Sequence, residues 1–266
     1  YLPILFWSLR MPNPILHQLS VAGSVLTSTL AAWRGTSVLK AASQPAQYLK
    51  LYDIEGCPDC RSVREALTAL GLDAQIYPCP KGGQRFRPEA QRLGGKQQFP
   101  LLIDPNTKTT LYESAAIIDY LFLTYAACPT PRTYQSSLRR PLLDRLASSV
   151  RGQRGVQARA ATHPRRLLEL WSFESSPYAR LVRERLCELE LPYVLHNIGK
   201  EQFADMGPAV MRVKPGPYKP RPGGRREKVL AQLGRIQVPY LEDPNTGTRM
   251  YESGAIIDYL EGQYAS

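Results

Sequence analysis

Apolar residues recur along the chain at two alternating spacings, and the same order of segments occurs twice. Short apolar runs next to turn-forming residues predict strands, and apolar positions three and four residues apart predict helices. Each half of the chain therefore has the predicted order βαβ followed by ββα. In the first half we expect strands over 48–53, 73–77, 99–103 and 109–112 and helices over 58–71 and 114–125; in the second half we expect strands over 167–173, 192–195, 238–241 and 248–251 and helices over 177–189 and 253–264.

The repeated order of elements reflects an internal sequence repeat. Residues 99–121 (FPLLIDPNTKTTLYESAAIIDYL) and 238–260 (VPYLEDPNTGTRMYESGAIIDYL) are identical at 16 of 23 positions, which chance does not produce. Residues 49–67 align with 168–186 at an offset of 119 positions in place of 139, so the second copy has 20 extra residues. These lie within 196–235, a segment rich in Pro, Gly, Lys and Arg.

A helix-like pattern precedes each copy. Leu16, Leu19 and Leu26 belong to one apolar stripe, and residues 138–150 repeat its spacing. We expect two equivalent leader helices, each docked on its own domain. The predicted division is a leader helix segment over 1–47, a glutaredoxin-like domain over 48–127, an Arg-rich helical linker over 128–166 and a second domain over 167–266.

The net charge of +11 is concentrated in the predicted linker. Residues 128–166 contain nine Arg and one Asp, whereas the blocks on either side are close to neutral. The linker has one aromatic residue, Tyr134, so the charge does not predict a nucleic-acid stacking platform. A solvated linker is the simplest interpretation, and a surface for an acidic protein or for lipid headgroups is the alternative. Residues 12–33 lack charge but are too polar for a membrane-spanning helix.

The clearest chemical motif is Cys57-Pro58-Asp59-Cys60, at the start of a predicted helix. A helix N-terminus surrounds the first sulfur with backbone N–H groups and stabilises its thiolate, which the Asp59 carboxylate should oppose. Cys57 would attack a disulfide, and Cys60, more buried, would resolve the mixed disulfide. The alternatives are a dithiol without a partner or a metal site, and two cysteines without a His cluster argue against a metal.

This motif, with Phe99-Pro100 and with Glu113-Ser114 followed by AIIDYL, resembles glutaredoxins and the N-terminal domain of glutathione transferases. The strings YPCPKGGQRFRPEA, GGKQQFP and DPNT, with LELW and SPY in the second copy, are similar to the tandem glutathione-transferase N-domain proteins of plant and algal plastids. The resemblance implies an α/β protein of two tandem thioredoxin-like domains. It also implies a chloroplast location, in the stroma or on the stromal face of the thylakoid.

The second copy keeps the pattern of elements but loses both sulfurs of the motif. Its aligned residues are Ser176-Pro177-Tyr178-Ala179, which excludes a dithiol mechanism there. The resemblance implies that the Ser176 hydroxyl bonds the glutathione thiolate, and a plain helix cap is the alternative. We expect Cys187 in the core and Cys79, which precedes Pro80, in a buried structural role.

The same resemblance implies a set of glutathione-binding residues. Phe99-Pro100 and Val238-Pro239 match the cis-proline position of the fold, where the preceding backbone can pair with a peptide. Glu113-Ser114 and Glu252-Ser253 precede the last helix of each copy, where a hydroxyl and N–H groups suit a carboxylate and a glutamate suits an ammonium group. Helix capping is the alternative for both pairs. The second groove is the less favourable one, because the 20-residue insertion would cover it.

We therefore expect a glutathione-linked thiol–disulfide oxidoreductase of glutaredoxin type, with an active Cys57/Cys60 site and a degenerate site at Ser176. Glutathione would be co-substrate or ligand, a protein disulfide the other substrate, and no metal is expected. The alternative is a non-catalytic scaffold or subunit of a larger plastid complex. Glutathione transferase activity ranks third, because that enzyme has an all-helical C-terminal domain that this sequence lacks. Peripheral membrane contact fits the charge, and nucleic acid is not an expected partner.

Overall fold

A computed structural model describes residues 14–135, 151–207 and 217–266. Helix α1 (Pro14–Leu30) comes first, and the short 3₁₀ helix η1 (Arg132–Tyr134) follows the first domain. The first domain contains β1 (Leu49–Asp53), α2 (Pro58–Leu70), β2 (Ala74–Pro78), α3 (Arg87–Gly94), β3 (Leu101–Asp104), β4 (Thr109–Tyr112) and α4 (Ser114–Ala126). The second contains β5 (Leu168–Ser172), α6 (Pro177–Glu188), β6 (Tyr193–Asn197), η2 (Phe203–Asp205), α7 (Arg225–Leu233), β7 (Tyr240–Asp243), β8 (Thr248–Tyr251) and α8 (Ser253–Tyr264).

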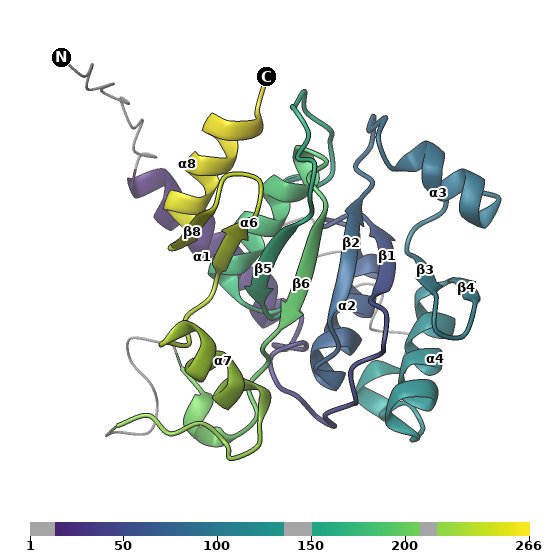
Figure 1. Cartoon of the computed structure of the whole chain (residues 1–266), viewed down its shortest axis with the longest axis vertical. Helices are drawn as coiled ribbons and strands as arrows, with labels where there is room; N and C mark the ends of the chain where they lie inside the picture. Colours follow the sequence, from purple (N-terminus) through teal and green to yellow (C-terminus); the bar gives the residue numbers. More distant parts are fainter. Residues whose placement is uncertain (1–13, 136–150, 208–216) are drawn as a thin grey trace.

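The strands of both domains form a single eight-stranded sheet in the order β4-β3-β1-β2-β6-β5-β7-β8 (Figure 1). Within each domain the first two strands are parallel and the last two are antiparallel, which is the predicted thioredoxin-like topology. The edge strands β2 and β6 pair antiparallel across the domain boundary, with Ile76 opposite Tyr193. The predicted fold class of two tandem α/β domains is confirmed. Because β2 and β6 pair with each other, neither of these two edge strands is left unpaired.

The predicted elements are present with ends shifted by a few residues. Helix α2 begins at Pro58, whose missing N–H has no partner in a first turn, and ends at Gly71, whose φ of 65° suits glycine. Two helices were not predicted, α3 and α7, because both are short and rich in polar residues. The predicted linker helix over 138–150 lies outside the described residues, so its equivalence with α1 stays a prediction.

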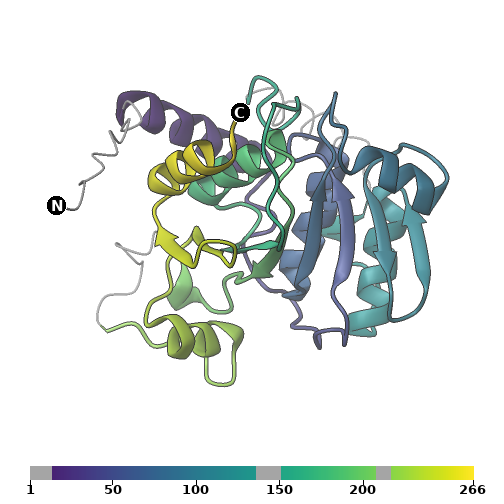
Figure 2. The same ribbon diagram turned by 45° about the horizontal axis from the view of Figure 1, so that its top comes forward.

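The prediction that α1 docks on its own domain is wrong. Helix α1 packs against α6 of the second domain (Figure 2). Its buried side is polar: Arg180 of α6 donates to the backbone oxygen of Ser24 over 3.0 Å, and the hydroxyl of Ser28 donates to the oxygen of Ser175 over 2.8 Å. These bonds satisfy polar groups that burial would otherwise penalise, so the apolar stripe of α1 faces outward.

The segments that precede the two domains are exchanged between them. Residues 35–38, ahead of the first domain, pair with the second domain through Ser175 N–H to Gly35 O (3.1 Å) and Lys200 N–H to Thr36 O (2.8 Å). Residues 155–158, ahead of the second domain, contact the first domain in the same way, and Gly56 N–H donates to Gly155 O over 3.2 Å. Each domain is therefore bordered by the chain that leads into the other.

A buried ring of charged side chains lies where the two domains meet. Arg64 on α2 contacts Glu174 (Nε to Oε2, 3.0 Å) and Glu55 (Nη2 to Oε2, 3.2 Å). Arg183 on α6 contacts the same two carboxylates at 3.1 Å each, and Asp53 bonds Arg64 as well. Burial raises the pKa of Glu55 to about 7, against the pull of the two arginines. The ring therefore joins both domains through groups with little access to water.

We predict that Arg64→Leu lowers the free energy of unfolding by about 3–5 kcal/mol, because it leaves buried carboxylates without their partner. Urea unfolding measures the change. Arg92→Gln is the matched control, since Arg92 is exposed on α3 and should alter stability by less than about 0.5 kcal/mol. Equal losses in the two variants would contradict a structural role for the ring.

Candidate functional sites

The first candidate site is the Cys57/Cys60 pair at the start of α2. Cys57 is the N-cap residue in an extended conformation and is half-buried, while Cys60 is fully buried one turn further on. The Cys60 sulfur also accepts from the N–H of Ile54 over 3.4 Å. The first cysteine of the pair is therefore partly exposed, and the second is buried behind it.

The two thiols differ in acidity as well as in exposure. A hydrogen bond from Cys60 lowers the pKa of Cys57 to about 7, with backbone N–H groups of the first helical turn adding to the effect. Burial and the Asp59 carboxylate oppose this decrease. Burial is the main cause that raises the pKa of Cys60 above its usual value. The expected opposition by Asp59 is present, but it is outweighed, so Cys57 has the properties of a nucleophile and Cys60 those of a buried resolving thiol.

The residues expected to hold glutathione in the first domain surround this thiol pair only in part. The Phe99-Pro100 bond is cis, as predicted, and Glu113 accepts a hydrogen bond from Gln98. Ser114 is the first residue of α4 and its hydroxyl donates to the Asp59 carboxylate over 3.4 Å. The Asp59 carboxylate therefore lies beside the Ser114 hydroxyl, which was expected to bind the carboxylate of glutathione.

The other three cysteines lie away from helix starts. Cys79 is buried and burial raises the pKa of its thiol, as its predicted structural role requires. Cys187 is in the core, as expected, and its sulfur accepts from the N–H of Glu55 in the other domain over 3.4 Å. Cys128 is half-exposed after α4.

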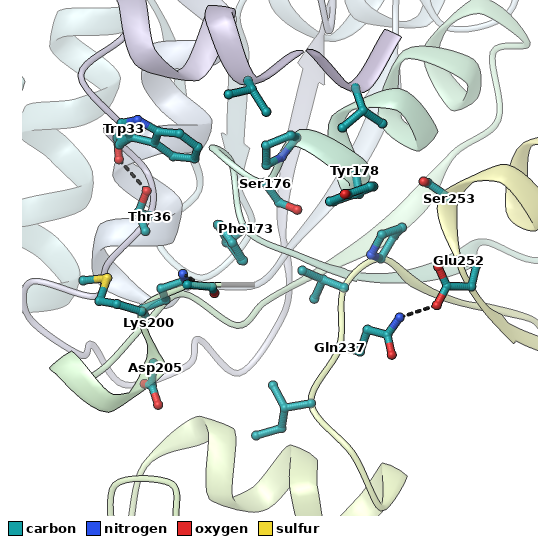
Figure 3. Close-up of a pocket in the computed structure, with 18 of the residues that line it drawn as sticks. Trp33, Thr36, Phe173, Ser176, Tyr178, Lys200, Asp205, Gln237, Glu252 and Ser253 are labelled. Carbon is teal, nitrogen blue, oxygen red and sulfur yellow. Dashed lines mark hydrogen bonds between the residues drawn. The ribbon is translucent and has the colours of Figure 1, made fainter. Parts of the chain in front are cut away.

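The second candidate site is a cavity of about 970 Å³ in the second domain. All five residues that the sequence assigned to glutathione in this copy line it: Ser176, Val238, Pro239, Glu252 and Ser253. The Val238-Pro239 bond is cis, as predicted. Figure 3 shows Ser176 between Trp33 on one side and Glu252 with Ser253 on the other. The structure brings the predicted set together around one volume large enough for a small-molecule ligand.

Ser176 is both a helix cap and a cavity residue. Its oxygen accepts from the N–H of Ala179 over 3.3 Å, so the capping alternative is confirmed. As an acceptor the hydroxyl keeps its own proton, which it can donate to a sulfur anion. The capping alternative for Glu252-Ser253 is not supported, because Glu252 occupies the N-cap position of α8 without a side-chain cap hydrogen bond. The Ser253 hydroxyl lies 3.2 Å from Nε2 of His17.

Both domains hold the glutamate before the last helix in a strained backbone conformation. Glu113 has φ 64° and Glu252 has φ 70°, a region that non-glycine residues rarely adopt. Gln98 and Gln237, each just before the cis-proline dipeptide, donate to these two glutamates. The sequence reasoning missed both glutamines, although their recurrence at the 139-residue offset was a signal that could have found them.

Most of the remaining cavity wall comes from segments that the sequence did not connect with this site. Helix α1 contributes Val21 and Val25, and the exchanged segment after it contributes Trp33 and Thr36. The insertion was expected to cover the groove, but its described part lines the cavity through residues such as Lys200. No local pattern could have revealed this wall, because it joins parts of the chain more than a hundred residues apart.

Within 14–135, 151–207 and 217–266, no group of three or more His, Cys, Asp or Glu side chains could hold a metal ion. In the same part of the chain, no helix is both long and apolar enough to cross a membrane.

Comparison with known proteins gives one match. The family described as the N-terminal domain of glutathione S-transferase matches residues 51–130 and again residues 170–266. No curated protein and no solved structure matches the chain.

We predict that alkylation of Cys57 has a pH midpoint of about 7, well below the value of about 8.5 for a free thiol. Asp59→Asn should move the midpoint lower still, because it removes a charge that opposes the thiolate. Rates with iodoacetamide, followed by mass spectrometry of the Cys57 peptide, measure both. A midpoint near that of a free thiol, or an increase with Asp59→Asn, would contradict this description of the site.

Proposed function

Because the chain belongs to the glutathione S-transferase N-terminal domain family, we propose that it is a glutathione-linked thiol–disulfide oxidoreductase of glutaredoxin type. Cys57 is its nucleophile and Cys60 its resolving thiol. The observation that carries this proposal is the asymmetry of the pair: Cys57 is accessible at a helix start, and Cys60 is buried one turn behind it. A chloroplast location and the redox role in the cell belong to the same proposal.

The proposed reaction needs no group beyond glutathione and the substrate. The Cys57 thiolate attacks the glutathione sulfur of a glutathionylated protein, which forms a Cys57–glutathione disulfide and releases the protein thiolate. A second glutathione thiolate then attacks the glutathione sulfur, which regenerates Cys57 and releases oxidised glutathione. Attack by Cys60 on Cys57 is the other route, and it releases reduced glutathione and leaves an intramolecular disulfide.

The second domain has the better arrangement for holding glutathione as a ligand. The buried hydroxyl of Ser253 and the first N–H groups of α8 suit the γ-glutamyl carboxylate, and Glu252 suits its ammonium group. In this proposal the backbone of Val238, which precedes the cis bond to Pro239, pairs with the peptide. In the first domain Asp59 would repel the same carboxylate from Ser114. We therefore assign ligand binding mainly to the second domain.

The cavity favours a second candidate function, conjugation of glutathione to another molecule at Ser176. In the structure, Val21 and Val25 of α1 and Trp33 after it line the cavity that contains Ser176, beside polar residues of the same segments (Figure 3). Such an enzyme needs apolar contacts there for its second substrate. The non-catalytic scaffold is the remaining alternative, and the partial exposure and lowered pKa of Cys57 support the redox proposal over it.

We predict that thiol–disulfide activity belongs wholly to the first domain. Cys57→Ser should abolish reduction of a glutathionylated peptide, whereas Cys60→Ser should spare it, since glutathione can resolve the intermediate. Ser176→Ala is the control in the other domain and should leave the rate unchanged. If the wild-type protein reduces no such peptide while its Cys57 thiol is free and reactive, the redox proposal fails and the scaffold takes its place.

We predict that Ser253→Ala weakens glutathione binding about tenfold, because it removes one hydrogen bond to a charged group. Ser114→Ala is the matched variant in the first domain and should change the affinity little. Isothermal titration calorimetry with the Cys57→Ser protein measures both without turnover. A larger loss with Ser114→Ala would assign the ligand to the first domain instead.

A further inference from the structure

Helix α1 has the reverse of the usual arrangement of polar and apolar side chains. Its buried positions include Ser24, Thr27 and Ser28, which are 2% exposed or less. Its outer side is apolar, with Ile15 68%, Leu19 63% and Leu26 49% exposed. A helix on a water-soluble surface normally has the opposite pattern.

The polar side of α1 is fixed by the second domain, so the helix cannot simply rotate to bury its leucines. Arg151 donates to the oxygen of Ser20 over 2.8 Å, and Arg180 donates to the oxygen of Ser24 over 3.0 Å. Ser28 adds a hydrogen bond to the backbone of Ser175. Rotation would break these hydrogen bonds within a buried interface, although Arg151 would keep its ion pair with Glu184.

The outward stripe has the spacing of a continuous contact surface. Ile15, Leu19, Ala22 and Leu26 follow one another at steps of four, three and four residues, and Leu16 at 61% exposure lies beside them. From Pro14 to Trp33 the chain has no Asp, Glu, Lys or Arg. A patch of this kind, without a charged residue within it, marks an interaction site.

We propose that the outer face of α1 docks the protein onto the surface of a membrane that contains anionic lipids. Charge complementarity favours this occupant over a second copy of the chain. Residues 128–166 contain nine Arg and one Asp, and Arg151 and Arg154 of this segment lie beside α1, so two copies would repel each other there. Arg154 is exposed beside the helix, where its Nη1 donates to the Ser20 hydroxyl over 2.7 Å, and can reach lipid phosphates. Apolar burial together with basic charge is the combination that holds interfacial helices on such membranes.

This inference does not depend on the proposed chemistry. The side of α1 that faces the protein contributes His17 and Val21 to the cavity. Docking through the outer side would therefore hold the cavity close to the lipid surface without covering the wall that α1 provides. The helix would lie along the membrane, in agreement with the absence of a spanning helix among the described residues.

Vesicle flotation with the full chain tests the proposal. We expect the wild type to bind vesicles of phosphatidylcholine and phosphatidylglycerol, and to bind phosphatidylcholine vesicles more weakly. The double variant Leu19→Ser/Leu26→Ser should lose about tenfold or more in affinity. Leu123→Ser is the matched control, since Leu123 is 60% exposed on α4 of the other domain, and it should bind as the wild type does. High salt should weaken binding.

Four outcomes would overturn the proposal. The first is a wild-type protein that binds neither kind of vesicle. The second is a control variant that loses as much affinity as the double variant. The third is sedimentation velocity that shows a wild-type dimer and a monomeric double variant, which would assign the face to a second copy. The fourth is a double variant that unfolds at a much lower temperature than Leu123→Ser, which would show that the chain itself covers the face.

Discussion

Two arginines buried between the domains are the constraint on which the rest of the structure depends. Arg64 and Arg183 each contact the carboxylates of Glu55 and Glu174, so each guanidinium binds both domains at once. Glu55 lies two residues before Cys57, and Glu174 lies two residues before Ser176. The ring therefore fixes the loops that lead into both candidate sites. It does so with buried charges, which the protein interior tolerates only when they are paired.

Exchange of the leading segments makes each site depend on the whole chain. Gly35 and Thr36 border the Ser176 loop, and Gly155 borders the Cys57 loop through the N–H of Gly56. The two copies share the same order of strands and helices but differ in their candidate sites. The first keeps a thiol of lowered pKa beside a buried partner. The second keeps the hydroxyl and a cavity to which α1 contributes Val21 and Val25 together with polar side chains. The chemistry that we propose divides between them in the same way.

The sequence predicted what is local and what repeats, and it failed where the two copies meet. Apolar spacing and the repeat predicted the strands and the main helices, because each depends on residues close in the chain, and the family resemblance implied both cis-proline positions. The charged ring was not predicted, since Arg64 on a helix resembles a solvated position until its partner domain is placed. The stripe of α1 was recognised but assigned to the wrong side, because spacing does not show which face docks. The five cavity residues of the second copy were identified from the sequence, but the rest of the cavity wall, which comes from α1, the segment after it and the insertion, was not.

Peptide mapping after exposure to oxidised glutathione tests the central claim most directly. In the Cys60→Ser protein the Cys57 thiolate should attack the disulfide and retain one glutathione, with release of the other as a thiolate. Cys128, which is half-exposed but lies away from any helix start, is an internal control in the same chain. The account predicts glutathione on the Cys57 peptide at neutral pH, with little on Cys128. Equal modification of both, or none on Cys57, would contradict it.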